Sequence, residues 1–165
     1  MTSTEMIEDM LERQKKYDAE VFKKHNITSV SRQQLESSLF DELGELMHAQ
    51  KGDRCWWKFT QESVDVAKVF EEYVDVLHFA LMFEITYGDC RYQNEDIEYN
   101  YRTLKFDSEL GQAYVYSRVL GSVEDDDVLA YVIALGLHMG FSLEAIYKEY
   151  IRKNEINKER LAKGY

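Results

Sequence analysis

The sequence predicts an all-α protein, a helical bundle that forms a single domain over residues 1–165. Helical periodicity dominates the chain, and no segment shows the strict alternation of apolar and polar residues that is typical of a strand. The chain contains no proline, so this helix breaker interrupts none of the predicted helices. A hydrophobic content of 45%, with 13% aromatic residues, favours a folded core over disorder.

Three long helices are predicted in the first half of the chain. The first runs from about Thr4 to His25, and Asn26 is its predicted stop. The second spans about Ser31 to Gln50 and ends before Gly52. The third covers about Gln61 to Tyr87 and is apolar nearly all round, which is typical of a central helix that is covered on several sides.

Three more helices are predicted in the second half, after a connection. Residues 88–106 are polar and aromatic with weak periodicity, so we interpret them as a connection or a variable insertion. A fourth helix is expected over about Asp107 to Leu120, and a fifth over about Val123 to His138 with Ser122 as its cap. The last helix is expected to run from Ser142 to about Leu161.

Four acidic residues form two pairs at helical spacing. One pair is Glu42 and Glu45 in the second helix, and the other is Glu72 and Asp75 in the third. Residues three apart share a helix face, where like charges repel and lose water if the face is apolar. A divalent cation would resolve both problems, and an all-carboxylate site suits Mg²⁺ or Mn²⁺ better than zinc or copper. The alternative is that these are ordinary surface acids.

The positions of the four acids favour the metal site. Glu42 falls inside the apolar arc of its helix, and Glu45 lies at the edge of that arc. Glu72 falls on the apolar stripe of the third helix, and Asp75 lies beside it. The apolar residues that define these two faces are Leu35, Leu39, Leu43 and Leu46 on the second helix, and Val69, Val76, Phe79 and Phe83 on the third.

The last helix changes character along its length. Its inner face begins with Ile146 and Tyr150, and the same line then becomes cationic and amide-rich. Lys and Arg supply charge and Asn supplies hydrogen bonds, as an anion site beside a metal cluster requires. The alternative is a solvated helix end, where the macrodipole favours cations. The polar residues on or beside this line are Lys153, Asn154, Asn157 and Arg160.

Composition excludes several classes of function. The net charge of −11 argues against general binding to nucleic acid, and no apolar run approaches the roughly 18 residues that span a bilayer. The acidic N-terminus lacks the features of a signal peptide, and Cys55 and Cys90 match no metal spacing, so we expect a reducing, intracellular setting. There is no glycine-rich phosphate loop and no Ser/His/Asp set for nucleophilic catalysis.

Three stretches of the chain resemble one known family. ELGE at 42–45, EEYVDVLHF at 71–79 and KNEINKERLAKGY at 153–165 resemble the dimeric all-α dUTPases, which are related to MazG-type nucleotide pyrophosphatases. The resemblance runs in order from Gln14 to Tyr165. The four-acid pattern is shared by the whole superfamily, whereas DVLHF and KNxxNxxRxxxGY are more specific to the dUTPase branch.

The resemblance implies roles for the phosphate end of the site. The four acids would hold Mg²⁺, with Mn²⁺ as a substitute, and Glu42 would also orient or deprotonate the attacking water. Asn154 or Asn157 would lie near the sugar hydroxyl. The residues implied to contact phosphates are Lys153, Arg160 and Lys163.

The resemblance also implies roles at the nucleoside end. His78 and Phe79 would lie against the deoxyribose, and Gln14 would contact the edge of the uracil. A tryptophan before Lys58 would lie near the base. The chain reads Trp56-Trp57-Lys58 where the family often has an aromatic-Lys-aromatic-Trp order, so Trp57 is the nearer candidate and Trp56 stays open.

The function implied is Mg²⁺-dependent hydrolysis of dUTP to dUMP and pyrophosphate, which limits uracil in DNA and supplies a thymidylate precursor. One alternative is a related pyrophosphatase for dCTP or a noncanonical nucleotide, and another is a helical module that binds a protein. We expect a homodimer, because the third, fourth and fifth helices carry more apolar surface than a lone bundle covers. We expect no nucleic-acid or membrane partner and a cytoplasmic location, in the host if a phage encodes the chain.

Overall fold

The computed structural model describes residues 1–88 and 92–164, and for Arg54 only the backbone. In this part of the chain it contains seven α-helices and one short 3-10 helix, with no β-strand. The prediction of an all-α fold is therefore confirmed. Cys90 lies outside the described residues.

The first three helices begin at residues whose side chains cap them. Helix α1 (Ser3–His25) follows Thr2, and α2 (Arg32–Gln50) follows Ser31, each in a reciprocal capping box. Helix α3 (Val66–Tyr87) begins after Asp65, whose carboxylate accepts hydrogen bonds from two backbone N–H groups of its first turn. Asn26 ends α1 in the left-handed conformation, as the sequence predicts.

The second half holds four α-helices. These are α4 (Asn94–Asp107), α5 (Gln112–Gly121), α6 (Val128–His138) and α7 (Leu143–Lys163). Ser142 caps α7 through a hydrogen bond that its side chain accepts from the backbone of Ala145. Gly164 ends α7 in the left-handed conformation, with φ of 83°.

The expected connection at 88–106 is wrong for most of its length, because α4 occupies it. This helix buries Ile97, Asn100, Leu104 and Asp107, which follow a helical spacing, but two of the four are polar. Its remaining positions are polar or partly exposed aromatic residues, which conceal the periodicity.

Three other predicted boundaries also need correction. Helix α3 begins at Val66 rather than Gln61, because Asp65 caps it there. Helix α5 begins at Gln112 rather than Asp107, which belongs to α4. Ser122 follows the end of α5 instead of capping the next helix, and α6 begins only at Val128.

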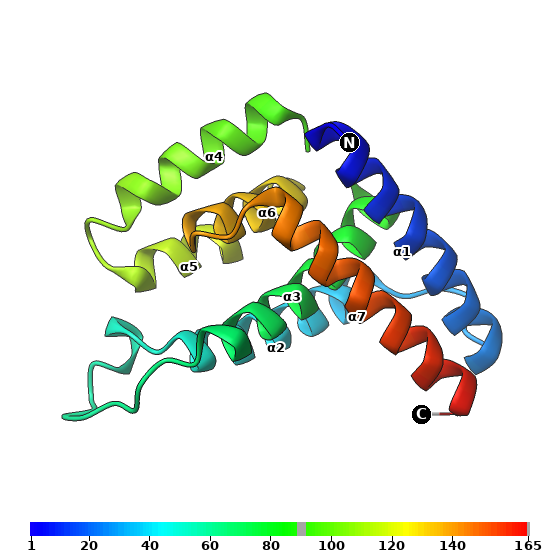
Figure 1. Cartoon of the computed structure of the whole chain (residues 1–165), viewed down its shortest axis with the longest axis horizontal. Coiled ribbons are helices and arrows are strands. Elements are labelled where there is room, and N and C mark those ends of the chain that lie inside the picture. The colour runs from blue at the N-terminus through cyan, green and yellow to red at the C-terminus, as the bar shows by residue number, and fades with distance from the viewer. Residues whose placement is uncertain (89–91, 165) are drawn as a thin grey trace.

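Helices α3 and α6 are central, and the other helices pack around them (Figure 1). Helix α6 packs against α3, α4, α5 and α7, and α2 packs along α3. Helices α1 and α7 lie side by side and run toward the same end of the molecule, where the C-terminus lies. The segment between α2 and α3 extends away from that end, and it contains the short 3-10 helix η1 (Asp53–Cys55).

A single chain covers most of its own apolar surface. Most apolar side chains at the centres of α3 and α6 are at most 1% exposed, and α4 packs against α6. These buried side chains need no second subunit as cover, so they do not support the expected homodimer. Helix α4, which stands where the sequence suggested a connection, covers part of α6. Fully covered side chains of this kind include Val74, Leu77, Leu81, Val128, Leu129, Val132 and Ile133.

No single helix of the described residues is long and apolar enough to cross a membrane. Helices α6 and α7 have the length and composition of a membrane-spanning segment only when they are taken together, as a pair bent by 112°. Nearly all of α6 is buried in the core, as is common for such segments.

Candidate active site

Three of the four predicted metal ligands come together where α2 faces α3. Glu42 and Glu45 on α2 and Glu72 on α3 each offer a carboxylate oxygen, and these oxygens lie within 4.8 Å of one another. The two helices pack along each other through their leucine and valine faces, so a spacing of three residues brings both members of the α2 pair toward α3. Glu72 is buried, Glu42 is half-buried and Glu45 is exposed.

Two lysines neutralise part of this negative charge. Lys153 on α7 donates a hydrogen bond of 2.9 Å to Asp75, the fourth predicted ligand, and it also reaches Glu71 at 3.3 Å. Lys68 forms an ion pair with Glu72 one turn along α3. The sequence reasoning missed Lys68, although its i,i+4 spacing from Glu72 was a usable signal.

Glu42 has the most strongly perturbed carboxyl of the cluster. Its pKa is raised to about 7, first because burial disfavours the charged form, and then because neighbouring carboxylates, Asp75 foremost, repel its charge. The pKa of Asp75 is also raised by burial, although Lys153 opposes that shift. Glu42 therefore gains most from a cation or a proton.

A cavity of about 370 Å³ opens beside the acids. This volume is in the range of small-molecule sites. Its wall combines the acids with aromatic and aliphatic side chains from α1, α3 and α7, including Tyr17, Phe22 and Met82. The predicted site residues that line it are Gln14, Glu42, Asp75, His78, Phe79, Asn157 and Arg160.

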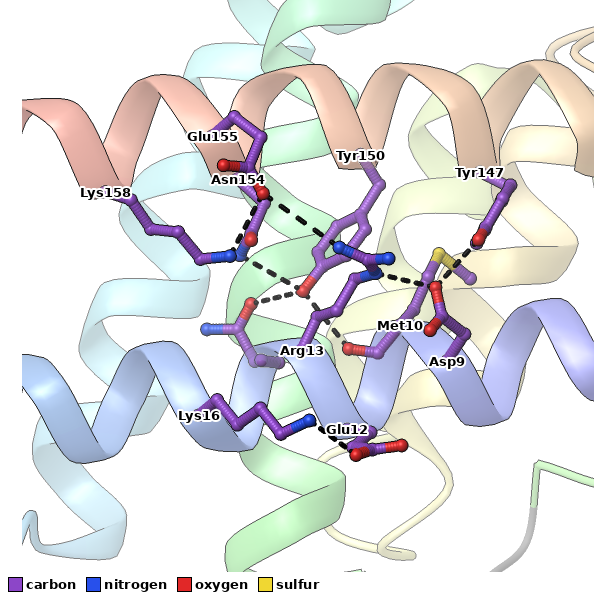
Figure 2. A network of polar contacts seen from close by, with 11 residues as sticks. Asp9, Met10, Glu12, Arg13, Lys16, Tyr147, Tyr150, Asn154, Glu155 and Lys158 are labelled. Carbon is purple, nitrogen blue, oxygen red and sulfur yellow. Dashed lines mark hydrogen bonds and ion pairs between the residues drawn. The ribbon is translucent and has the colours of Figure 1, made fainter.

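Polar contacts hold α1 and α7 together (Figure 2). Asp9 accepts hydrogen bonds of 2.7 Å from both Arg13 and the Tyr147 hydroxyl. One step further along, the Tyr150 hydroxyl lies 3.1 Å from the backbone carbonyl of Met10. Both helices also contribute residues to the cavity, so these contacts hold two of its walls together.

The predicted site residues of α7 divide into three groups. Lys153 and Asn154 are buried, the first against Asp75 and the second near the Tyr150 hydroxyl, and neither lines the cavity. Asn157 and Arg160 line the cavity. Lys163 is exposed and lies 3.8 Å from Glu159, so the single chain does not bring it to the pocket.

Trp57 and Lys58 also lie away from this cavity in the single chain. Both belong to the segment between α2 and α3, where Trp57 is 56% exposed and Trp56 is 84% exposed. Lys58 lines a separate polar cavity of about 640 Å³ with Lys51 and His48. A third cavity, of about 460 Å³, contains Glu45 and Glu72 and shares Lys51 and His48 with the second. The acids thus lie between the aromatic cavity and this segment.

Asp18 is a cavity residue that the sequence reasoning did not select. It lies one turn after Gln14 on α1 and lines the same cavity. Burial raises its pKa to about 6, and a hydrogen bond from Gln14 opposes the shift. Its position four residues after Gln14 was the only signal in the sequence, and acids on helices are usually solvated.

Acids at metal-binding spacing, a helix that carries cations and an aromatic cavity in an all-α fold are the features expected of a nucleotide-hydrolysing enzyme. A family model described as dUTPase matches residues 6–165. The chain belongs to the dUTPase family and is a dUTP diphosphatase. Neither a curated protein nor a solved structure matches it.

Proposed function

We propose that this enzyme hydrolyses dUTP to dUMP and pyrophosphate in a Mg²⁺-dependent reaction, with Mn²⁺ as a substitute. The observation that carries the proposal is the position of the acid cluster beside a cavity that also contains Asn157 and Arg160. Acids that hold a cation and an arginine that binds phosphate are the two parts that hydrolysis of a phosphoanhydride needs.

The donor set fits the proposed ion. Glu42, Glu45 and Glu72 offer only carboxylate oxygens, which are the hard ligands that Mg²⁺ and Mn²⁺ prefer. Their oxygens lie within 4.8 Å of one another, so one ion could be reached by all three. Asp75 would join them if Lys153 turned toward Glu71, its second partner. A bound ion would neutralise charge on the phosphate chain and polarise the bond to be broken.

The residues of the chain divide the remaining work. Glu42 belongs to the acid cluster and also lines the cavity, so it is placed to orient or deprotonate the attacking water. Arg160 would bind the phosphate chain, and Asn157, which lines the cavity, would serve the sugar hydroxyl. Asn154 is fully buried outside the cavity lining, so it is the weaker of the two candidates for that contact. Phe79 and the other aromatic side chains of the cavity would hold the nucleoside, because aromatic rings pack well against the flat face of a base.

We further propose a homodimer that completes the site. Trp56, Trp57 and Phe59 are exposed, and all three lie in the segment between α2 and α3 (residues 51–65), which projects from the bundle and is called the projecting segment below. Apolar side chains gathered in this way mark an interaction surface. A second copy would cover them and would bring Trp57 and Lys58 of one subunit toward the nucleotide of the other. An enzyme that removes dUTP from the precursors of DNA would act in the cytoplasm.

The direct test is pyrophosphate release from a panel of deoxynucleoside triphosphates with and without Mg²⁺. We expect release from dUTP only when the metal is present. Release from dCTP in preference to dUTP would favour the alternative pyrophosphatase. Release from no nucleotide with either Mg²⁺ or Mn²⁺ would contradict the proposal.

A further inference from the structure

The amide of Gln14 lies at the centre of a buried hydrogen-bond network on the cavity wall. Gln14 is 3% exposed, and its Nε2 donates a hydrogen bond of 2.7 Å to Asp18 Oδ1. Its Oε1 lies 2.8 Å from His78 Nδ1 and 3.1 Å from the Tyr150 hydroxyl. The Tyr150 hydroxyl also lies 3.1 Å from the Met10 carbonyl (Figure 2). Three helices, α1, α3 and α7, meet in this network.

Most groups of this network can point their hydrogen bonds either way. An amide can turn over, a neutral imidazole can carry its proton on either nitrogen, and a tyrosine hydroxyl both donates and accepts. An ionised carboxylate only accepts. Asp18 therefore fixes the Gln14 amide with Nε2 toward itself and Oε1 toward His78. An oxygen in that place must receive a proton, so His78 carries its proton on Nδ1.

This assignment leaves His78 Nε2 as a bare acceptor. His78 is 7% exposed and lines the cavity, and its Nε2 has no hydrogen-bond partner among the described residues. Burial, followed by the charge of Lys153, lowers the pKa of His78 to about 3, so the ring stays neutral. Asp18 Oδ2 is likewise buried without a partner in the described part of the chain. Buried acceptors without partners are costly, and a bound ligand can supply the missing donors.

We propose that Asp18 is a positioning residue which sets the direction of this network, so that His78 Nε2 accepts a hydrogen bond from the bound nucleoside. The donor of that hydrogen bond is an O–H or N–H group of the nucleoside. For the ligand, the inference rests on the proposed function, under which the donors are the N3–H of the uracil and the 3′-hydroxyl of the sugar. The orientation of Gln14 and His78 does not depend on that function.

The orientation is tested by ¹⁵N NMR of the histidine rings in the whole protein without ligand. At pH 8 the Asp18 carboxyl is ionised, because its pKa is about 6. We expect His78 to be protonated on Nδ1 in the wild type, and to shift toward the Nε2-protonated form in Asp18→Ala. Asp18→Asn, which keeps the size but can also donate, should give a mixture. Glu8→Gln removes the same charge from an exposed position on α1 and should change nothing.

Two results would overturn the positioning role. One is a wild-type His78 protonated on Nε2, which requires no variant to fold. The other is an unchanged Nδ1-protonated ring in a folded Asp18→Ala protein. Because these spectra need no substrate, they remain decisive even if dUTP is not hydrolysed.

The acceptor role is tested by binding of dUMP, of its 3′-deoxy analogue and of its N3-methyl analogue. In the wild type, the analogue that lacks the matching donor should bind about ten-fold more weakly than dUMP, which corresponds to one lost hydrogen bond. In Asp18→Ala that penalty should largely disappear, and KM for dUTP should rise while kcat changes little. The analogue with the larger wild-type penalty identifies the donor. Equal penalties in the two proteins for both analogues would overturn the acceptor role.

Discussion

Lys153 on α7 donates a hydrogen bond to Asp75 on α3, with 2.9 Å between Nζ and Oδ2. The lysine is 7% exposed and the Asp75 side chain 23%, so this contact is partly shielded from water. It joins the helix that carries Asn157 and Arg160 to the helix that carries two of the proposed metal ligands. The cationic helix and the acid cluster are thus one electrostatic unit.

Replacement of Lys153 tests this unit. In metal-free protein at pH 8, Lys153→Met should lower the free energy of unfolding by about 2 kcal/mol, because it removes a partly buried charged hydrogen bond. The loss should shrink at lower pH, where Asp75, whose pKa burial raises, takes up a proton. Urea unfolding at several pH values measures both effects. Lys148→Met, exposed on the same helix, is the control. An equal loss for both variants would contradict the proposed link.

Glu42→Gln should abolish turnover of dUTP, because an amide neither replaces an ionised metal ligand nor takes a proton from water. Asp75→Asn should do the same. Asp41→Asn, an exposed neighbour of Glu42, should keep most of the activity. Near-wild-type rates for Glu42→Gln and Asp75→Asn at saturating Mg²⁺ would rule out the four-acid site.

The raised pKa of Glu42 should be visible in the pH dependence of stability, without any substrate. A carboxyl whose pKa is higher in the folded state binds its proton more tightly there, so its ionisation destabilises the fold. Glu42 should therefore lower the stability of the metal-free protein as the pH rises from about 4.5 to about 7. Glu42→Gln should reduce this slope and stabilise the metal-free protein at pH 8. Thermal unfolding in chelator measures the slope, and an unchanged slope would count against the assigned pKa.

Arg160→Ala should weaken binding of a non-hydrolysable dUTP analogue more than binding of dUMP, because its proposed partner is the phosphate chain. Calorimetry on the two ligands gives the difference directly. Arg152→Ala is a matched control, since Arg152 is exposed on α7 and pairs with Glu149. Equal losses for both ligands would indicate a structural role for the helix end.

Gly136→Ala tests the packing that positions α3. A Cβ on Gly136 would lie 2.4 Å from the Tyr73 ring and 2.8 Å from Ile146, both fully buried. We expect a loss of about 1–3 kcal/mol in the free energy of unfolding, as for other overpacked cores. Gly44→Ala has open space around the new methyl group and should gain up to about 1 kcal/mol from helix propensity. Chemical denaturation of the two variants measures the difference, and similar stabilities for both would contradict the tight packing at Gly136.

The proposed dimer should be visible in solution at concentrations where the enzyme is active. Light scattering should give about twice the 19.5 kDa of one chain, and dilution should reduce specific activity together with mass. Trp57→Ser with Phe59→Ser should weaken association, because both side chains are exposed in the projecting segment. A mass near 19.5 kDa in a fully active sample would refute the dimer.

Strong periodicity and capping chemistry made most of the fold predictable. The leucine face of α2 is buried as predicted, and Asn26, Ser31 and Ser142 end or begin helices where their side chains favour it. Helix α4 was not predictable in this way, because its buried Asn100 and Asp107 look like surface residues in the sequence. Their partners, Asp127 and Arg118, come from later segments that pattern reading does not connect.

The candidate site was predictable where its residues lie on helices. Spacing alone brings Glu42 beside Glu45, and packing of α2 on α3 adds Glu72. The positions of Trp57 and Lys58 depend on a segment without regular structure, whose path no periodicity defines. The role of Asp18 depends on burial, which an acid in an amphipathic helix does not reveal by its spacing.

The projecting segment is closed at its base. The Gln61 side chain exchanges two hydrogen bonds with the backbone of Gly52, at 3.1 and 3.0 Å, and Lys51 donates one of 2.8 Å to the Ser63 carbonyl. These hydrogen bonds hold the end of α2 and the residues before α3 together, independently of the tip of the segment between them. Over evolution, the tip can therefore change length and sequence without displacing the four acids. A change at the tip would alter the proposed dimer contact and the proposed nucleotide contacts of Trp57 and Lys58, while the four acids keep their positions on α2 and α3.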